Sequence, residues 1–178
     1  MNKNNYISLA NKAANLQINE LKKVKKVFNK SFVKAVDCIL NCKGKIIFAG
    51  VGKSGLIARK ISATFSSIGV PSFFCDPAQA LHGDMGQIEK KDILFVFSYS
   101  GNTSELTNML KYANRFRIKI VGVASKPESI LLKASDIKLL LPKVKESDIT
   151  GMVPTTSTSI TLLLGDCLAS TVISKRKF

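Results

Sequence analysis

The chain has 178 residues, 46% of them hydrophobic, which is enough to bury one full core in a single domain. Its formal net charge of +15 raises the possibility of a nucleic-acid partner. Much of this charge lies in two short clusters, at 22–30 and 175–177, and no basic strand interleaved with aromatic residues accompanies it. We therefore expect solvated basic helix faces and no nucleic-acid partner, although the charge attracts anionic metabolites.

Targeting signals and metal sites are not evident in the sequence. No apolar run reaches the roughly 18 residues of a membrane span, and the N-terminus has no signal-peptide block. We therefore expect a cytoplasmic protein with no membrane partner. Cys38 and Cys42 lie one helical turn apart in an apolar pattern, which indicates buried, reduced thiols. With one histidine in the chain, the spacing of the four cysteines predicts no zinc site.

Helical and strand patterns alternate along the chain. Residues 5–42 have apolar positions at helical spacing, with a break near 29–31 and a stop at 43–44. Strands are predicted at 45–49, 70–75, 93–97, 119–124 and 137–141, and helices at 54–68, 103–116, 128–134 and 155–174. Residues 76–87, with room for one helical turn, and 146–156 are predicted loops. The alternation predicts an α/β fold with a doubly wound parallel sheet. We expect one domain over 1–178, with an N-terminal helical segment (1–44) and an α/β core (45–178).

Two predicted strands end in loops of glycine, serine and other small polar residues. One loop is 50–55 and the other is 98–105, and each precedes a helix. Parallel strands place such loops at the same edge of the sheet, where helix N-termini favour anions. In 98–105, hydroxyl side chains surround a glycine, a pattern typical of an anion-binding nest. The sequence therefore predicts a phosphorylated ligand.

A dinucleotide-binding fold is an alternative interpretation of the first loop. Residues 50–55 satisfy the G-x-G-x-x-G pattern, and Asp76 stands where a ribose-binding acid would lie. A chain of 178 residues leaves no room for a separate substrate domain, however, and the second phosphate-type loop has no role in that fold. We therefore favour a small phosphorylated metabolite over a dinucleotide.

Several motifs together resemble a known family. They are Gly-Lys-Ser-Gly at 52–55, Pro-Ser-Phe-Phe at 71–74, His-Gly-Asp at 82–84, Ser-x-Ser-Gly at 98–101 and Thr-Ser-Thr at 156–158. In number and order they resemble the sugar isomerase (SIS) domain, and more narrowly the arabinose 5-phosphate isomerases that feed Kdo synthesis for lipopolysaccharide. The resemblance implies a flavodoxin-like, five-stranded parallel sheet flanked by helices, and a homo-oligomer, specifically a tetramer. In that family a tandem CBS pair usually follows; this sequence ends at Phe178, before such a pair.

The resemblance also implies a reaction and its residues. It is the interconversion of D-arabinose 5-phosphate and D-ribulose 5-phosphate through an enediol, which needs no metal or redox cofactor. The family's catalytic lysine falls on Lys53, its two glutamates on Glu105 and Glu146, and a substrate-contacting histidine on His82. Which glutamate is the base stays open. Asp76 stands where many relatives have a histidine that can bind zinc, and a further catalytic histidine of the family would lie beyond Phe178.

The expected substrate contacts are polar groups at the ends of strands and helices. The resemblance and the loop chemistry together place the phosphate on Ser54, Ser98, Ser100 and Thr103. Further contacts are expected from a pocket rim and from the start of the last helix, at Gly69, Val70, Pro142, Lys143, Val144, Thr156, Ser157 and Thr158. A sugar-phosphate-binding SIS module without turnover is the alternative. The apolar stretch 160–173 and the N-terminal helical segment are predicted to form the oligomer interface.

Overall fold

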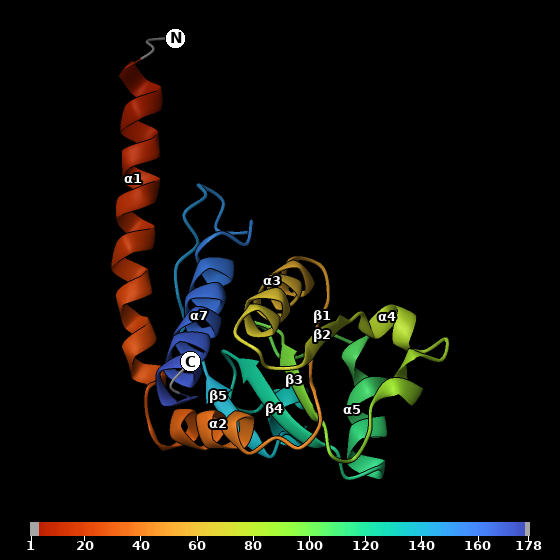
Figure 1. The fold of residues 1–178 in the computed structure, drawn as a ribbon. Helices are drawn as coiled ribbons and strands as arrows, with labels where there is room; N and C mark the ends of the chain where they lie inside the picture. Colours follow the sequence, from red (N-terminus) through yellow and green to blue (C-terminus); the bar gives the residue numbers. More distant parts are fainter. Residues whose placement is uncertain (1–3, 177–178) are drawn as a thin grey trace.

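Five parallel strands form one sheet at the centre of the molecule, and helices cover both of its faces (Figure 1). The computed structural model describes residues 4–176. The strands are β1 (Ile46–Gly50), β2 (Ser72–Cys75), β3 (Ile93–Phe97), β4 (Lys119–Ala124) and β5 (Ile137–Leu140). Their spatial order is β2-β1-β3-β4-β5, and every pairing is parallel. This is the flavodoxin-like order and not that of the dinucleotide-binding fold, so the predicted fold class is confirmed.

Two separate cores lie on the two faces of the sheet, because successive side chains of a strand point to opposite faces. In β1, Ile46 and Phe48 join the core under α2 (Lys30–Leu40), α3 (Lys53–Ser67) and α7 (Thr156–Arg176). Ile47 and Ala49 join the core under α4 (Pro77–Ala80), α5 (Leu106–Arg115) and α6 (Ile130–Ala134). Every residue of β1 is buried, which explains its continuous apolar pattern.

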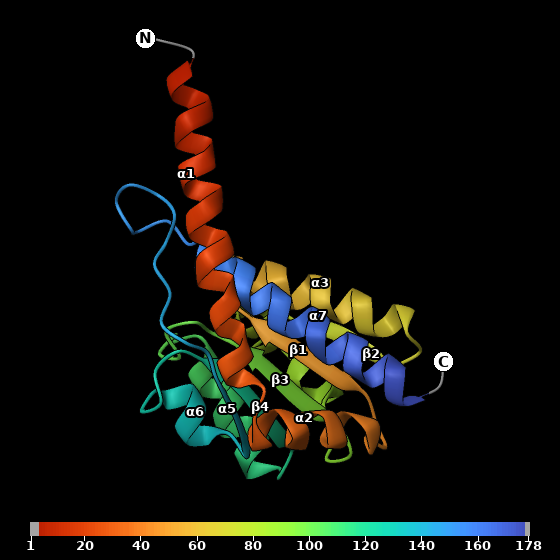
Figure 2. The same cartoon turned by 90° about the vertical axis from the view of Figure 1, so that its left-hand side faces the viewer.

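The N-terminal helical segment breaks near 29–31 as predicted, but the part before the break is divided into two helices. Helix α1 (Asn4–Leu21) ends well before the expected break, and the 3-10 helix η1 (Lys22–Val27) follows it. A 3-10 helix has three residues per turn, so Val24 and Val27 lie on one face, and both are buried. Asn29 then caps α2 by accepting a hydrogen bond from the Ser31 backbone N–H. The first turns of α1 extend away from the rest of the molecule (Figure 2).

Helix α7 packs closely against α3. A Cβ at Gly165 would lie 2.6 Å from Cγ1 of Ile61 in α3, so only glycine permits this approach. The stretch 160–173 was predicted to form an oligomer interface; at Gly165, its close neighbour is a helix of the same chain. Within the described residues, α7 is the one helix long and apolar enough, by length and composition, to cross a membrane. This corrects the expectation that no segment has that character. Half of the relevant window is buried inside the fold, as in the core helix of a folded domain.

Smaller differences from the sequence predictions have local causes. Strand β2 starts at Ser72, because Pro71 has no N–H to pair, although its carbonyl still accepts from the Ile46 N–H at 2.9 Å. The predicted loop at 76–87 contains two short helices, α4 and η2 (Asp84–Gln87). Cys38, in α2, and Cys42, two residues after it, are half-buried and not buried as expected; all four cysteines are free thiols.

Candidate active site

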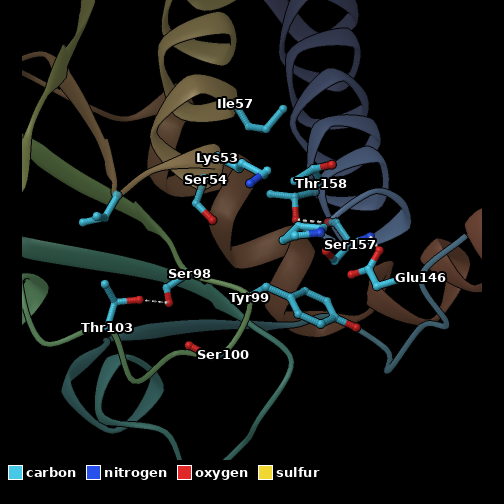
Figure 3. A pocket seen from close by; sticks show the side chains of 13 residues that line it. Lys53, Ser54, Ile57, Ser98, Tyr99, Ser100, Thr103, Glu146, Ser157 and Thr158 are labelled. Atoms are coloured by element: carbon cyan, nitrogen blue, oxygen red, sulfur yellow. Dashed lines mark hydrogen bonds between the residues drawn. The ribbon is translucent and has the colours of Figure 1, made fainter. Parts of the chain in front are cut away.

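A pocket of about 340 Å³ opens at the carboxyl ends of β1 and β3. These two strands flank the topological switch point of a flavodoxin-like sheet, where open α/β sheets bind ligands. Its walls come from the loops after β1 and β3, the first turns of α3 and α7, and the loop before α7 (Figure 3). The residues that line it are Val51, Lys53, Ser54, Ile57, Ser98, Tyr99, Ser100, Thr103, Glu146, Pro154, Ser157, Thr158 and Thr161.

One wall is the 98–103 loop, which its own hydrogen bonds hold in a tight turn. The Gly101 N–H donates to both the carbonyl and the Oγ of Ser98 at 3.0 Å. The Ser98 and Thr103 hydroxyls lie 2.8 Å apart (Figure 3). Gly101 has φ +70°, and a Cβ there would overlap Ser129, so the turn requires glycine. The loop thus presents the Ser98, Ser100 and Thr103 side chains to the pocket, a chemistry suited to a phosphate.

The opposite wall begins at the N-terminus of α3. Lys53 and Ser54 are the first two residues of this helix, and both line the pocket. The positive end of the helix dipole therefore faces the cavity along with the Lys53 ammonium. Lys53 is exposed, and its side chain makes no ion pair with any residue in 4–176. The ammonium is thus available to an anionic ligand.

The third wall carries a carboxylate. One oxygen of Glu146, Oε2, accepts three hydrogen bonds: from the Thr155 N–H at 2.8 Å, the Thr155 hydroxyl at 3.0 Å and the Ser157 N–H at 3.2 Å. Burial alone would raise the pKa of Glu146, but the hydrogen bonds from Ser157 and Thr155 outweigh it and the pKa is lowered. Glu146 is therefore ionised at neutral pH. It lies on the α7 side of the pocket, away from the Ser98, Ser100 and Thr103 side chains (Figure 3).

The second predicted glutamate lies elsewhere. Glu105 is exposed just before α5, and its Oε2 accepts from the Ser104 hydroxyl at 2.8 Å. Hydrogen bonds from its own backbone N–H and from Ser104 lower the pKa of Glu105. It does not line the pocket. Of the two glutamates, the structure brings only Glu146 to the cavity within one chain.

Several other predicted residues also lie outside the pocket. His82 is exposed between α4 and η2. Gly69 and Val70 line a separate depression beyond the far end of α3. Thr156 is fully buried, and its Oγ1 has no hydrogen-bond partner among the described residues. Asp76 caps α4 by accepting from the Ala78 N–H at 2.9 Å. Within residues 4–176, no three His, Cys, Asp or Glu side chains are grouped to hold a metal ion.

Tyr99 is a pocket residue for which the sequence analysis predicted no role. Its hydroxyl accepts from the Val144 N–H at 2.9 Å and donates to the Pro142 carbonyl at 3.2 Å. It therefore holds the predicted rim at 142–144, which includes the exposed Lys143, although none of these three residues lines the pocket itself. Thr161 was also missed; it lies one helical turn after Ser157, so helical periodicity could have found it.

Comparisons with known proteins agree with this geometry. Residues 39–171 match the model of the SIS domain, and the chain belongs to this family. It is similar to the arabinose 5-phosphate isomerase KdsD of Pseudomonas aeruginosa, with 42% identity over 83% of this chain and 45% of the relative. It is also 39% identical to protein RP505 of Rickettsia prowazekii, over 100% of this chain and 56% of the relative. The chain spans about half the length of the curated relatives it matches.

Solved structures are similar over the whole chain. The c3406 protein of E. coli CFT073, solved in complex with arabinose 5-phosphate, has a TM-score of 0.95 and 32% identity, covering 100% of this chain and 95% of the other. A protein of Listeria monocytogenes has a TM-score of 0.96 and 30% identity, with coverage of 100% and 94%.

Proposed function

We propose that this chain is an aldose–ketose isomerase for a pentose 5-phosphate, and that it interconverts D-arabinose 5-phosphate and D-ribulose 5-phosphate. The observation that carries the proposal is the composition of one pocket. A hydroxyl-rich loop suited to phosphate forms one wall, and Lys53 and Glu146 line other walls of the same pocket. Similarity to KdsD and to c3406, solved with arabinose 5-phosphate, supports the choice of sugar.

The reaction needs a base and a group that stabilises an oxyanion. In the proposed mechanism Glu146 takes the proton from carbon 2 of the open-chain aldose. The electrons of that C–H bond form the carbon 1–carbon 2 double bond, and the carbonyl oxygen becomes the enediolate oxygen, which Lys53 stabilises. Glu146 returns the proton to carbon 1, and the hydroxyl proton on carbon 2 moves to the oxygen of carbon 1, which gives the ketose. Ser54 and the 98–103 loop hold the phosphate throughout.

The proposal assigns the base to Glu146 because this carboxylate lines the cavity. Glu105 and His82 would reach the substrate only after a loop movement or from a neighbouring copy of the chain. A homo-oligomer, expected as a tetramer, is part of the proposal, and exposed apolar residues on the projecting α1 support it: Ile7, Leu9 and Ile18. The proposed role is to supply arabinose 5-phosphate for Kdo synthesis in the cytoplasm.

The test separates turnover from binding. Lys53→Ala should lower kcat by about 100-fold or more, because an oxyanion loses its stabilising charge. Lys60→Ala is the matched control, since Lys60 is on the same helix but pairs with Asp166 outside the pocket. Equal kcat in the two variants would refute the role of Lys53. Calorimetric binding of the sugar phosphate by a parent protein without turnover would favour the alternative, a sugar-phosphate-binding module.

A further inference from the structure

A chain of hydrogen bonds links the N-terminal helix to the carboxylate in the pocket. The side-chain nitrogen of Gln17, in α1, donates to the Ser147 hydroxyl at 3.1 Å. The Ser147 hydroxyl donates to Thr155 Oγ1 at 3.0 Å, and the Thr155 hydroxyl donates to Glu146 Oε2 at 3.0 Å. We call these four residues the Gln17 relay. It connects two segments that lie far apart in the sequence.

Counting donors and acceptors shows that the relay has one direction. An amide NH₂ group can only donate, so the Ser147 hydroxyl oxygen accepts from Gln17. The one hydrogen of this hydroxyl is then donated to Thr155 Oγ1. The Thr155 oxygen also accepts the Ser147 N–H at 2.9 Å, which fills its two lone pairs. The one hydrogen of Thr155 is then left for Glu146. A donor held on a carboxylate in this way favours its charged form.

The same helix also holds the chain on both sides of Glu146. The Ser159 hydroxyl lies 3.0 Å from Gln17 Oε1 and 2.9 Å from the Thr155 carbonyl, and these two acceptors share its one hydrogen. This contact attaches α1 to the first turn of α7. Glu20 Oε2 accepts from the Lys145 N–H at 2.9 Å. Glu20 is itself held by Lys23, whose ammonium lies 2.6 Å from the same oxygen. The residues directly before and after Glu146 are therefore both bonded to α1.

We propose that Gln17 is a positioning residue for this active site, which fixes the Glu146 carboxylate in the pocket through Ser147 and Thr155. The inference rests on the proposed function, in which Glu146 is the base. Gln17 lies outside residues 39–171, the part of the chain that matches the SIS domain. A helix that precedes the matched domain thus takes part in shaping the site, and Glu20 supplies its second anchor.

Two variants of Gln17 distinguish the effect of its hydrogen-bond donor from the effect of the size of its side chain. Gln17→Ala removes both bonds, whereas Gln17→Glu keeps the shape and an acceptor for Ser159 but loses the donor to Ser147. Asn15→Ala, at an exposed amide of the same helix, is the control. Both Gln17 variants should lower kcat by about tenfold or more, because a misplaced base is costly. KM should change less than about twofold, since the 98–103 loop is untouched. The acid limb of the pH profile should move to higher pH.

A measurement that does not need turnover keeps the two proposals distinguishable. Titration of the Glu146 carboxyl carbon by NMR should give a higher midpoint in Gln17→Ala and Gln17→Glu than in the parent and Asn15→Ala. Amide exchange should be faster at Lys145 and Ser157 in Gln17→Ala. Unchanged midpoints in correctly folded variants would overturn the relay, even if the parent is an active isomerase. If the Gln17 variants show shifted midpoints but the parent shows no turnover, the result would support the relay and count against the proposed function.

Discussion

Replacing Tyr99 with phenylalanine removes a single hydroxyl that holds the 142–144 segment in place. This hydroxyl accepts from the Val144 N–H at 2.9 Å, within normal range, and donates to the Pro142 carbonyl at a longer 3.2 Å. The variant leaves a part-buried N–H without its acceptor, which costs about 1–2 kcal/mol, and the longer bond to the carbonyl adds less. We expect Tyr99→Phe to lower the free energy of unfolding by about 1–2 kcal/mol.

Urea denaturation followed by circular dichroism, at one protein concentration, measures this loss. Tyr112→Phe is the control, because the Tyr112 ring packs on Phe116 and its hydroxyl makes no hydrogen bond within the described residues. Faster amide exchange at Val144 in Tyr99→Phe alone would locate the effect. A stability equal to that of the Tyr112→Phe variant would refute the reasoning that this hydroxyl anchors the segment.

Three further expectations follow from packing, charge and surface. Gly165→Ala should cost about 1–3 kcal/mol in thermal denaturation, because the new methyl meets Ile61, whereas Ser170→Ala on the exposed side of α7 should be neutral. Burial would raise the pKa of Asp92, but hydrogen bonds from Lys45 and Glu89 outweigh it and the pKa is lowered. Asp92 therefore stabilises the fold above its ordinary pKa, so the stability deficit of Asp92→Asn should be largest at pH 7 and shrink as pH falls through the lowered pKa. Light scattering at micromolar concentration should give a mass well above 19.4 kDa; a stable monomer would contradict the proposed oligomer.

The sheet and the phosphate-type loop could be predicted because their signals are local. Each strand is a short, continuous apolar run, and the residues that close the 98–103 turn are adjacent in the sequence. Helix boundaries could not be predicted where an α-helix and a 3-10 helix fit the same spacing of apolar residues. Val24 and Val27 fit one face of either an α-helix or a 3-10 helix, so the end of α1 could not be read from the pattern.

The rest of the site depends on contacts between distant segments. Gln17 is a polar residue in an amphipathic helix, and nothing near it in the sequence indicates Ser147 or Ser159 as partners. Similarly, the sequence could not decide between Glu105 and Glu146, because each follows a loop that ends near the same sheet edge. The three-dimensional structure shows only which of the two lies at the cavity: Thr155 and Ser157 hold Glu146 there.

The most direct test of the proposed isomerase is proton exchange in D₂O. The purified chain is mixed with D-arabinose 5-phosphate, and NMR follows the carbon 2 proton of the aldose and the carbon 1 position of the ketose. An enediol mechanism with Glu146 as base predicts that the carbon 2 proton of the aldose is lost as the ketose forms. Carbon 1 of D-ribulose 5-phosphate carries that proton where Glu146 returns it directly, and deuterium where the proton on Glu146 first exchanges with D₂O. Glu146→Gln should slow ketose formation by about 100-fold or more. A folded parent that binds the sugar phosphate but forms no ketose and exchanges no proton would contradict the proposed function.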